Sequence, residues 1–156
     1  MSETETEGRF LVTHVDDTSA VLKDVDRGQV HTLGDNPDLE EGDLLEGAVA
    51  PEPPMEVTYE LVEIEARRNL TVEHSPEPPT KQERDIAAEQ AEGELATRER
   101  AGTGELHVLT VPDDETDEAI EDVLNDEATL VRAARLDVNR VEIRSKPGVV
   151  SVRYLP

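Results

Sequence analysis

The chain lacks cysteine and tryptophan, and its aromatic side chains are limited to Phe10, Tyr59 and Tyr154. The absence of cysteine excludes disulfides, thiolate metal ligands and thiol nucleophiles. The scarcity of rings leaves no platform on which several nucleic-acid bases could stack. It also predicts a core of aliphatic side chains, each of which stabilises a fold less than a buried ring does.

Positive charge is scarce as well. The 156 residues contain 38 acids against 15 lysines and arginines, a formal net charge of −23. Such a charge strains a compact chain in dilute solution, whereas in molar salt the Debye length falls to about 3 Å and the repulsion is screened. The apolar residues, 35% of the chain, recur at regular periods, which argues against disorder. We therefore expect a folded, salt-adapted protein.

No segment predicts export or membrane insertion. Residues 1–8 are polar and acidic and do not follow the pattern of a signal peptide. No run approaches the ~20 apolar residues that a membrane-spanning helix needs. We expect a cytoplasmic protein that has no membrane partner.

Residues 8–75 are expected to form a β-rich module. Short apolar runs alternate with turn residues, and a long alternating run places Val57, Tyr59 and Leu61 on one face. The stretch from Gly42 to Gly47 resembles the turn and strand of many OB-like and SH3-like barrels, in which glycine lets the backbone bend. These patterns predict a small barrel-like module, with a rolled open sheet as the alternative.

Residues 76–104 are interpreted as a proline-rich connector. The tetrapeptide Pro-Glu-Pro-Pro occurs at 51–54 and again at 76–79. We interpret both copies as rigid polyproline joints, the alternative being ligands for an aromatic-lined groove. Thr80 and Glu83 predict the capping box of a surface helix that continues to about residue 90. The polar, glycine-containing segment 92–104 predicts a loop.

Residues 105–156 are expected to form a β-α-α-β-β module, which makes the whole chain α+β. Apolar residues at helical spacing predict two short helices separated at Asn125 and Asp126, with one kinked helix as the alternative. A right-handed crossover is expected to place the first strand parallel to its partner. Because each module is small, we expect the two to pack on each other or on a second copy.

Motifs for catalysis and metal binding are missing. The chain has no phosphate-binding loop, no nucleophile elbow and no zinc-protease motif. His14, beside Asp16 and Asp17, would need a distant third ligand to hold a metal. The acidic residues 113–122 do not fit the EF-hand template and are interpreted as carboxylates placed at the start of a helix, where its dipole favours them. We expect no metal, no cofactor and no enzymatic activity.

Arginines gather near the end of the chain. Between residues 130 and 156 there are only two acids, Asp137 and Glu142, against six bases: Arg132, Arg135, Arg140, Arg144, Lys146 and Arg153. Helical spacing places the first two arginines on one face, and strand alternation places Arg140 and Arg144 on another, with Arg153 expected opposite them. The arginines either bind an anionic partner or pair internally with acids, since the guanidinium fork suits phosphate and carboxylate alike.

Salt favours the internal or protein-facing role, because binding driven by counterion release weakens steeply as salt rises. We therefore expect a non-enzymatic binding or adaptor protein, with a protein partner or self-association. The alternative is a nucleic-acid- or ribosome-associated protein that uses Arg132, Arg135, Arg140, Arg144 and Arg153. A third option is an enzyme whose site forms only across the modules.

Four segments together resemble an uncharacterised family of extremely halophilic archaea, a domain of unknown function. They are residues 8–14, 50–54, 101–105 and 148–156. The resemblance extends over the whole chain and implies a cytoplasm rich in KCl. It implies no reaction and no site residues.

Overall fold

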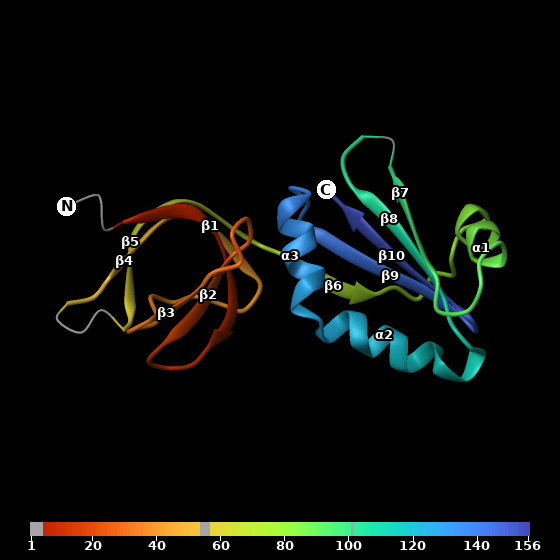
Figure 1. Ribbon diagram of the computed structural model, residues 1–156, viewed down its shortest axis with the longest axis horizontal. Coiled ribbons are helices and arrows are strands. Elements are labelled where there is room, and N and C mark those ends of the chain that lie inside the picture. Colours follow the sequence, from red (N-terminus) through yellow and green to blue (C-terminus); the bar gives the residue numbers. More distant parts are fainter. Residues whose placement is uncertain (1–4, 54–56, 101) are drawn as a thin grey trace. The chain divides into compact units, whose positions relative to one another are not determined.

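The computed structural model describes residues 5–53, 57–100 and 102–156. The chain forms two compact units that divide between Leu70 and Thr71. The described residues form a mixed α+β structure with two five-stranded sheets and three α-helices, as Figure 1 shows. The second Pro-Glu-Pro-Pro joint lies within these residues, whereas the last residue of the first joint lies outside them.

The first unit is a ring of five strands. The strands are β1 (Thr6–Val15), β2 (Ala20–Asp24), β3 (Val30–Leu33), β4 (Asp43–Pro51) and β5 (Tyr59–Asn69). They pair in the order β1-β2-β3-β5-β4, and β1 also pairs with β4, which closes the ring. Among the described residues of this ring, the pairing of Leu33 with Tyr59 is parallel and the other strand pairs are antiparallel. The ring encloses Phe10, Leu22 and Leu45, so alternate residues of its strands supply the expected aliphatic core.

Gly47 lies at a register shift of the ring. The register between β4 and β5 shifts between Glu46 and Gly47. A Cβ atom at this position would collide with the carbonyl oxygen of Glu63 on β5. Glycine is therefore required here because two backbones approach closely at a register shift, whereas the sequence predicted that the glycines of this segment let the backbone bend.

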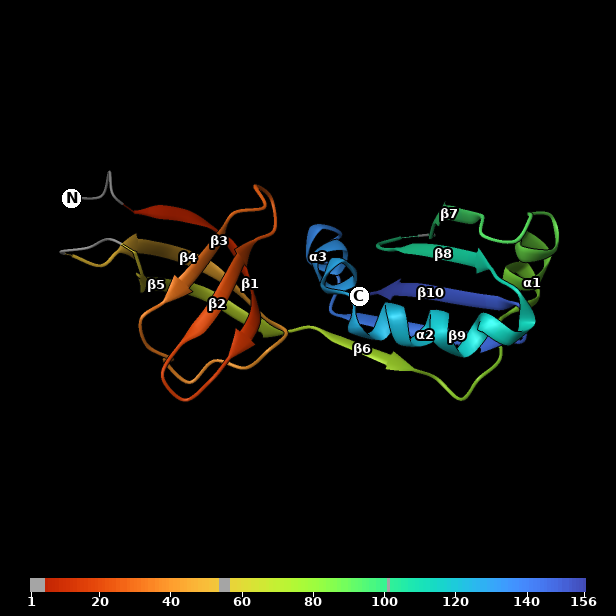
Figure 2. The ribbon, with the colours of Figure 1, turned by 60° about the horizontal axis from the view of Figure 1, so that its bottom comes forward.

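The second unit contains the other five strands and the helices. Its elements are β6 (Thr71–His74), α1 (Lys81–Ala88), β7 (Leu95–Glu99), β8 (Glu105–Thr110), α2 (Thr116–Asn125), α3 (Glu127–Arg135), β9 (Arg140–Lys146) and β10 (Val149–Leu155). The strand order is β6-β9-β10-β8-β7, which Figure 2 shows from β7 at the top to β6 at the bottom. A 3-10 turn, Asp113–Glu115, precedes α2.

Helices cover both faces of this sheet. On one face α2 contacts β6, β9 and β10, and α3 contacts β6 and β9. On the other face α1 contacts β8 and β10, and its Ala87 packs with Leu106, Val108 and Val149. The predicted capping box of α1 is present, because Thr80 accepts a hydrogen bond from the Glu83 amide and Glu83 accepts one from the Thr80 amide.

Three sequence-based expectations differ from the structure. The segment 92–104 was expected to be a loop, yet β7 pairs with β8. Residues 71–75 were expected to belong to the first module, yet β6 pairs with β9 in parallel. The strand β8 was expected parallel to its partner, yet it pairs antiparallel with β10, while the parallel pair of this sheet is β6 with β9. Pairing partners depend on contacts distant in sequence, and an exposed edge strand such as β7 has little apolar alternation to reveal it.

The expected break between two helices is confirmed. The helix α2 ends at Asn125, and Asp126 caps α3 by accepting a hydrogen bond from the Ala128 amide. The N-cap residue of α2, Glu115, makes no side-chain capping bond, and Asp117 and Glu118 lie in the first turn, where the helix dipole favours acids. Within the described residues, no helix combines the length and the apolar character needed to cross a bilayer.

Candidate anion-binding face

A row of charged side chains crosses the α1 side of the second sheet. Glu73 on β6, Glu142 on β9, Arg153 on β10, Leu106 on β8 and Arg98 on β7 lie directly opposite one another in successive pairs. Residues that are directly opposite in a sheet share a face, with about 5 Å between neighbouring strands. The row therefore brings together residues that are far apart in the sequence.

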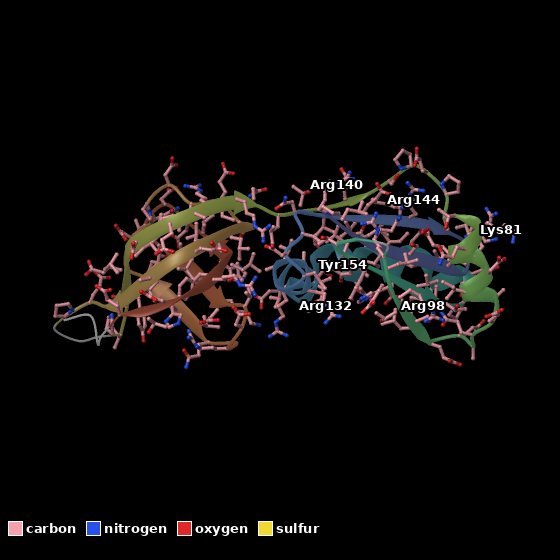
Figure 3. All side chains as sticks on the ribbon, turned by 90° about the horizontal axis from the view of Figure 1, so that it is seen from above. Lys81, Arg98, Arg132, Arg140, Arg144 and Tyr154 are labelled. Atoms are coloured by element: carbon pink, nitrogen blue, oxygen red, sulfur yellow. The ribbon has the colours of Figure 1, made fainter. Side chains whose placement is uncertain are left out.

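Arg140 and Arg144 flank this row on β9, as strand alternation predicted, and Figure 3 labels both of them. We call Arg98, Arg140, Arg144 and Arg153 the arginine face. Arg153 lies on the same side because it is paired with Glu142, which stands between Arg140 and Arg144 on β9. The predicted placement of these three arginines on one face is thus present in the structure.

Glu142 is the centre of an ion-pair network. Its Oε1 accepts hydrogen bonds from Arg144 Nε at 2.6 Å and from Arg153 Nη1 at 2.8 Å. Arg144 also reaches Glu77 with Nη2, at 2.7 Å. Burial of the Glu142 carboxyl opposes its ionisation, but the hydrogen bonds from the two arginines hold its pKa below the ordinary value. Arg144 and Arg153 therefore keep the buried carboxylate of Glu142 charged.

Arg153 also approaches a second buried acid. Its Nε lies 3.5 Å from Oε2 of Glu83, a side chain that is only 2% exposed. The other oxygen of Glu83 accepts the capping bond from the Thr80 amide. The N-terminus of α1 is thus fastened over β10 by a shared carboxylate.

Arg132 lies on the opposite side of the sheet, near Tyr154 in Figure 3. Its Nη2 donates to both oxygens of Glu105, at 2.7 and 2.8 Å. Glu105 also lies 2.8 Å from His107 Nε2, and the His107 ring packs against Tyr154 with centroids 4.9 Å apart. Burial opposes ionisation of Glu105, yet hydrogen bonds from Arg132 and His107 lower its pKa. Burial raises the pKa of Tyr154 to about 12.

The five arginines predicted to act together are therefore divided between two sides of the sheet. Arg140, Arg144 and Arg153 stand on the α1 side, whereas Arg132 and Arg135 belong to α3, which packs on the other side. Arg135 and Arg140 are exposed, and Arg140 has a long ion pair to Glu73, 3.8 Å between Nη1 and Oε1.

Two arginines that the sequence analysis did not consider join the face at its β7 edge. Arg98 donates from Nη1 to the carbonyl oxygen of Thr97, and Arg100 donates from Nη1 to that of Thr103. Within the described residues neither guanidinium has a carboxylate within ion-pair distance, although acids are plentiful in this chain. No strand pattern in the sequence reveals them, because β7 is largely exposed and ends at Glu99, before Arg100.

These two arginines line a cavity of about 370 Å³ that also includes Arg153. Its apolar wall is Leu106, and its remaining side is the start of α1, with Thr80 and Glu83. Three arginines thus line one space between the helix and the edge strand. Such an arrangement can hold an anion by charge-assisted hydrogen bonds.

The histidines and the acidic segment have other surroundings. His31 is buried between the rings of Phe10 and Tyr59, and both of its nitrogens lack a hydrogen-bond partner among the described residues. Asp16 accepts hydrogen bonds from Thr18 and Ser19, which close a turn beside His14. In residues 5–53, 57–100 and 102–156 no group of three or more histidines and acids is placed to hold a metal ion.

Comparisons with known proteins identify the family but no relative of known activity. No curated protein and no solved structure matches the chain. The model of one family, described as a family of unknown function (DUF5812), matches residues 6–145, which is most of the chain. The chain therefore belongs to this family of unknown function.

Proposed function

We propose that this protein is a non-enzymatic binding or adaptor protein, and that the arginine face receives an anionic protein partner. The observation that carries the proposal is the gathering of Arg98, Arg140, Arg144 and Arg153 on one side of one sheet in a chain of net charge −23. Glu142 pairs with Arg144 and Arg153, so the exposed Arg98 and Arg140 supply the local positive charge that an anionic partner would meet.

A protein partner is favoured over a nucleic acid for two reasons. Arg144 and Arg153 are held by Glu142, so fewer cations remain for phosphates than the several that tight nucleic-acid binding uses. The second reason is the lack of rings: Phe10 and Tyr154 are buried, which leaves no aromatic platform for bases. A nucleic-acid- or ribosome-associated role remains the second candidate, supported by the exposed Arg140 and Arg98.

We further propose that the protein works in a salt-rich cytoplasm, as an archaeal halophile provides. The charge of −23 and the presence of arginine partners at buried acids support this proposal. The closed ring of strands and the register shift at Gly47 support a barrel of the OB or SH3 kind for the first unit, ahead of the α/β module.

An enzymatic role has less support. Such a role would be favoured by a deep cavity in which His14, His31 or His107 meets acids. The 370 Å³ cavity is lined instead by arginines, Leu106 and the start of α1. His31 is surrounded by rings, and His107 is occupied by Glu105.

The test is copurification from cells of the organism that makes the protein, lysed at their own salt concentration. Arg140→Glu reverses one exposed charge of the arginine face and breaks only a 3.8 Å ion pair, so the fold should persist. Lys81→Glu is the matched control, because it makes the same charge change on the exposed side of α1. Circular dichroism of each variant checks the fold.

We expect a partner protein to be retained by the wild type and by Lys81→Glu, and lost by Arg140→Glu. Retention of RNA or DNA with the same dependence on Arg140, confirmed by filter binding in about 2 M KCl, would favour the second candidate. Equal retention by all three proteins, or retention of nothing, would contradict the proposed binding face.

A further inference from the structure

We propose that the cavity between α1 and β7 binds the phosphate group of a small phosphorylated compound. The inference goes beyond the proposed function, because it concerns a small ligand and rests on Arg98 and Arg100, which the macromolecular proposal does not require together. Arg153 completes the set of guanidinium groups around the cavity.

The side chains of Arg98, Arg100 and Arg153 line one cavity. Arg98 is directly opposite Leu106, and Leu106 is directly opposite Arg153, so the three side chains share one face across β7, β8 and β10. Arg100 directly follows β7 and lines the same cavity. Leu106, only 8% exposed, forms an apolar floor between the cationic walls.

The charge balance at the cavity favours an anion. Two acids belong to its lining, Glu83 and Glu99. Glu83 is held by Arg153 and by the Thr80 amide, so its charge is already compensated. Glu99 ends β7 directly opposite Glu105, so its side chain is turned to the other face of the sheet from Arg98. The guanidinium groups of Arg98 and Arg100 therefore supply positive charge that no described carboxylate neutralises.

The start of α1 adds to this field. Thr80 and Glu83 satisfy two amide groups through the capping box, and the helix dipole places partial positive charge at the same end. The guanidinium fork donates two parallel hydrogen bonds to phosphate oxygens, so two such forks match a dianionic phosphate monoester better than a single carboxylate.

The size and the expected salt conditions favour a small compound. A volume of about 370 Å³ is at the lower end of the range for small-molecule pockets and exceeds what a lone phosphate fills. The apolar floor at Leu106 offers contact to the group that carries the phosphate. Contacts inside a cavity are screened by salt less than contacts on an open surface, so this site can act where counterion release no longer drives binding.

Nuclear magnetic resonance titration with phenyl phosphate, in about 2 M KCl, tests the assignment. The arginine Nε–H signals report each guanidinium directly. We expect saturable shifts of the Arg98, Arg100 and Arg153 signals, and we expect Arg98→Gln/Arg100→Gln to weaken binding at least about tenfold. The variant Arg84→Gln is the control for lost charge, since Arg84 lies on α1 outside this cavity. Inorganic phosphate is expected to bind more weakly, because it makes no contact with Leu106.

Absence of saturable shifts in the wild type, or equal weakening by Arg84→Gln, would overturn the proposal. So would displacement of phenyl phosphate by a short single-stranded RNA at lower concentration, because the site would then belong to a nucleic acid. Arg140→Glu separates the two proposals: it is expected to leave phenyl phosphate binding unchanged while removing the partner protein. Either proposal can therefore fail while the other holds.

Discussion

At the scale of single residues, the arginines of this acidic chain hold its buried carboxylates. Asp24 accepts hydrogen bonds from Arg27, and Asp43 accepts them from Arg67. In the second unit Arg153 stands between two such acids, Glu83 and Glu142. A charge left unpaired in a protein interior costs several kcal/mol, so a chain with so many acids needs cations at its buried positions. Because the chain has only 15 lysines and arginines, the loss of one of these arginines would leave its buried acid without a partner of opposite charge.

His31 is the residue for which a pH dependence follows. Burial lowers its pKa, and the charge of Asp24 opposes the shift only in part. The unfolded chain therefore takes up the proton first. The contribution of His31 to stability is complete above its unfolded pKa of about 6.5 and declines as the pH falls below that value. We expect the midpoint of chemical unfolding to drop between about pH 7.5 and about pH 5.5.

The variants His31→Phe and His14→Gln separate this effect from other titrations. Phenylalanine fits beside Phe10 and Tyr59 and carries no proton, so His31→Phe should flatten the pH profile in this range. His14 is exposed, and its replacement should leave the profile unchanged. An identical decline in His31→Phe and the wild type would show that other groups cause it.

At the scale of elements, the ring of the first unit depends on the close approach of β4 and β5. Gly47→Ala places a Cβ atom against the carbonyl oxygen of Glu63, and the backbone must move to admit it. We expect a loss of about 2–4 kcal/mol in the free energy of unfolding, measured with guanidinium chloride. Gly28→Ala is the matched control, because nothing lies within 4 Å of its added methyl group and only the positive φ of 79° is strained. Equal losses in both variants would contradict the role of close approach.

The helix α1 depends on its capping box. Thr80→Ala removes the hydroxyl that accepts a hydrogen bond from the Glu83 amide. This loss should lower the free energy of unfolding by about 1 kcal/mol. Thr80→Ser keeps a hydroxyl in place and should retain most of the stabilisation that this hydrogen bond supplies. Urea unfolding of the two variants and the wild type measures the difference. If alanine and serine behave alike, the hydroxyl does not hold this helix end.

Local patterns explain which elements were predicted correctly. The cap at Thr80 and the break at Asp126 depend on residues three or fewer apart, so the sequence shows them directly. The strands β6 and β7 are stabilised by partners far along the chain, and the largely exposed β7 lacks the apolar alternation that identifies a strand. The site shows the same contrast between local spacing and distant contacts. Arg140 and Arg144 are grouped by their spacing on one strand, whereas Arg98 joins them only through strand pairing.

At the scale of the whole molecule, the net charge of −23 predicts that salt stabilises the fold. We expect the thermal unfolding midpoint to rise as KCl increases from about 0.1 M to about 2 M, because screening removes self-repulsion. Circular dichroism measures both the midpoint and the cooperativity.

A variant with fewer acids is the control for this prediction. Replacing the exposed Asp117, Glu118, Glu121 and Asp122 by their amides should reduce the gain from salt. A sharp and equally stable transition of the wild type in dilute buffer would contradict the inference of salt adaptation.

The sequence by itself determined the excess of acids, the poverty in rings, the helix caps and the alternation that places Arg140 and Arg144 together. These features depend on composition or on neighbours within one turn of helix or a few residues of strand. Only the tertiary structure decided that Arg132 lies on the other side of the sheet, that Glu142 holds Arg144 and Arg153, and that Arg98 and Arg100 line a cavity with Arg153. Strand order and register make those choices, because they join segments whose mutual contacts leave no periodic trace in the chain.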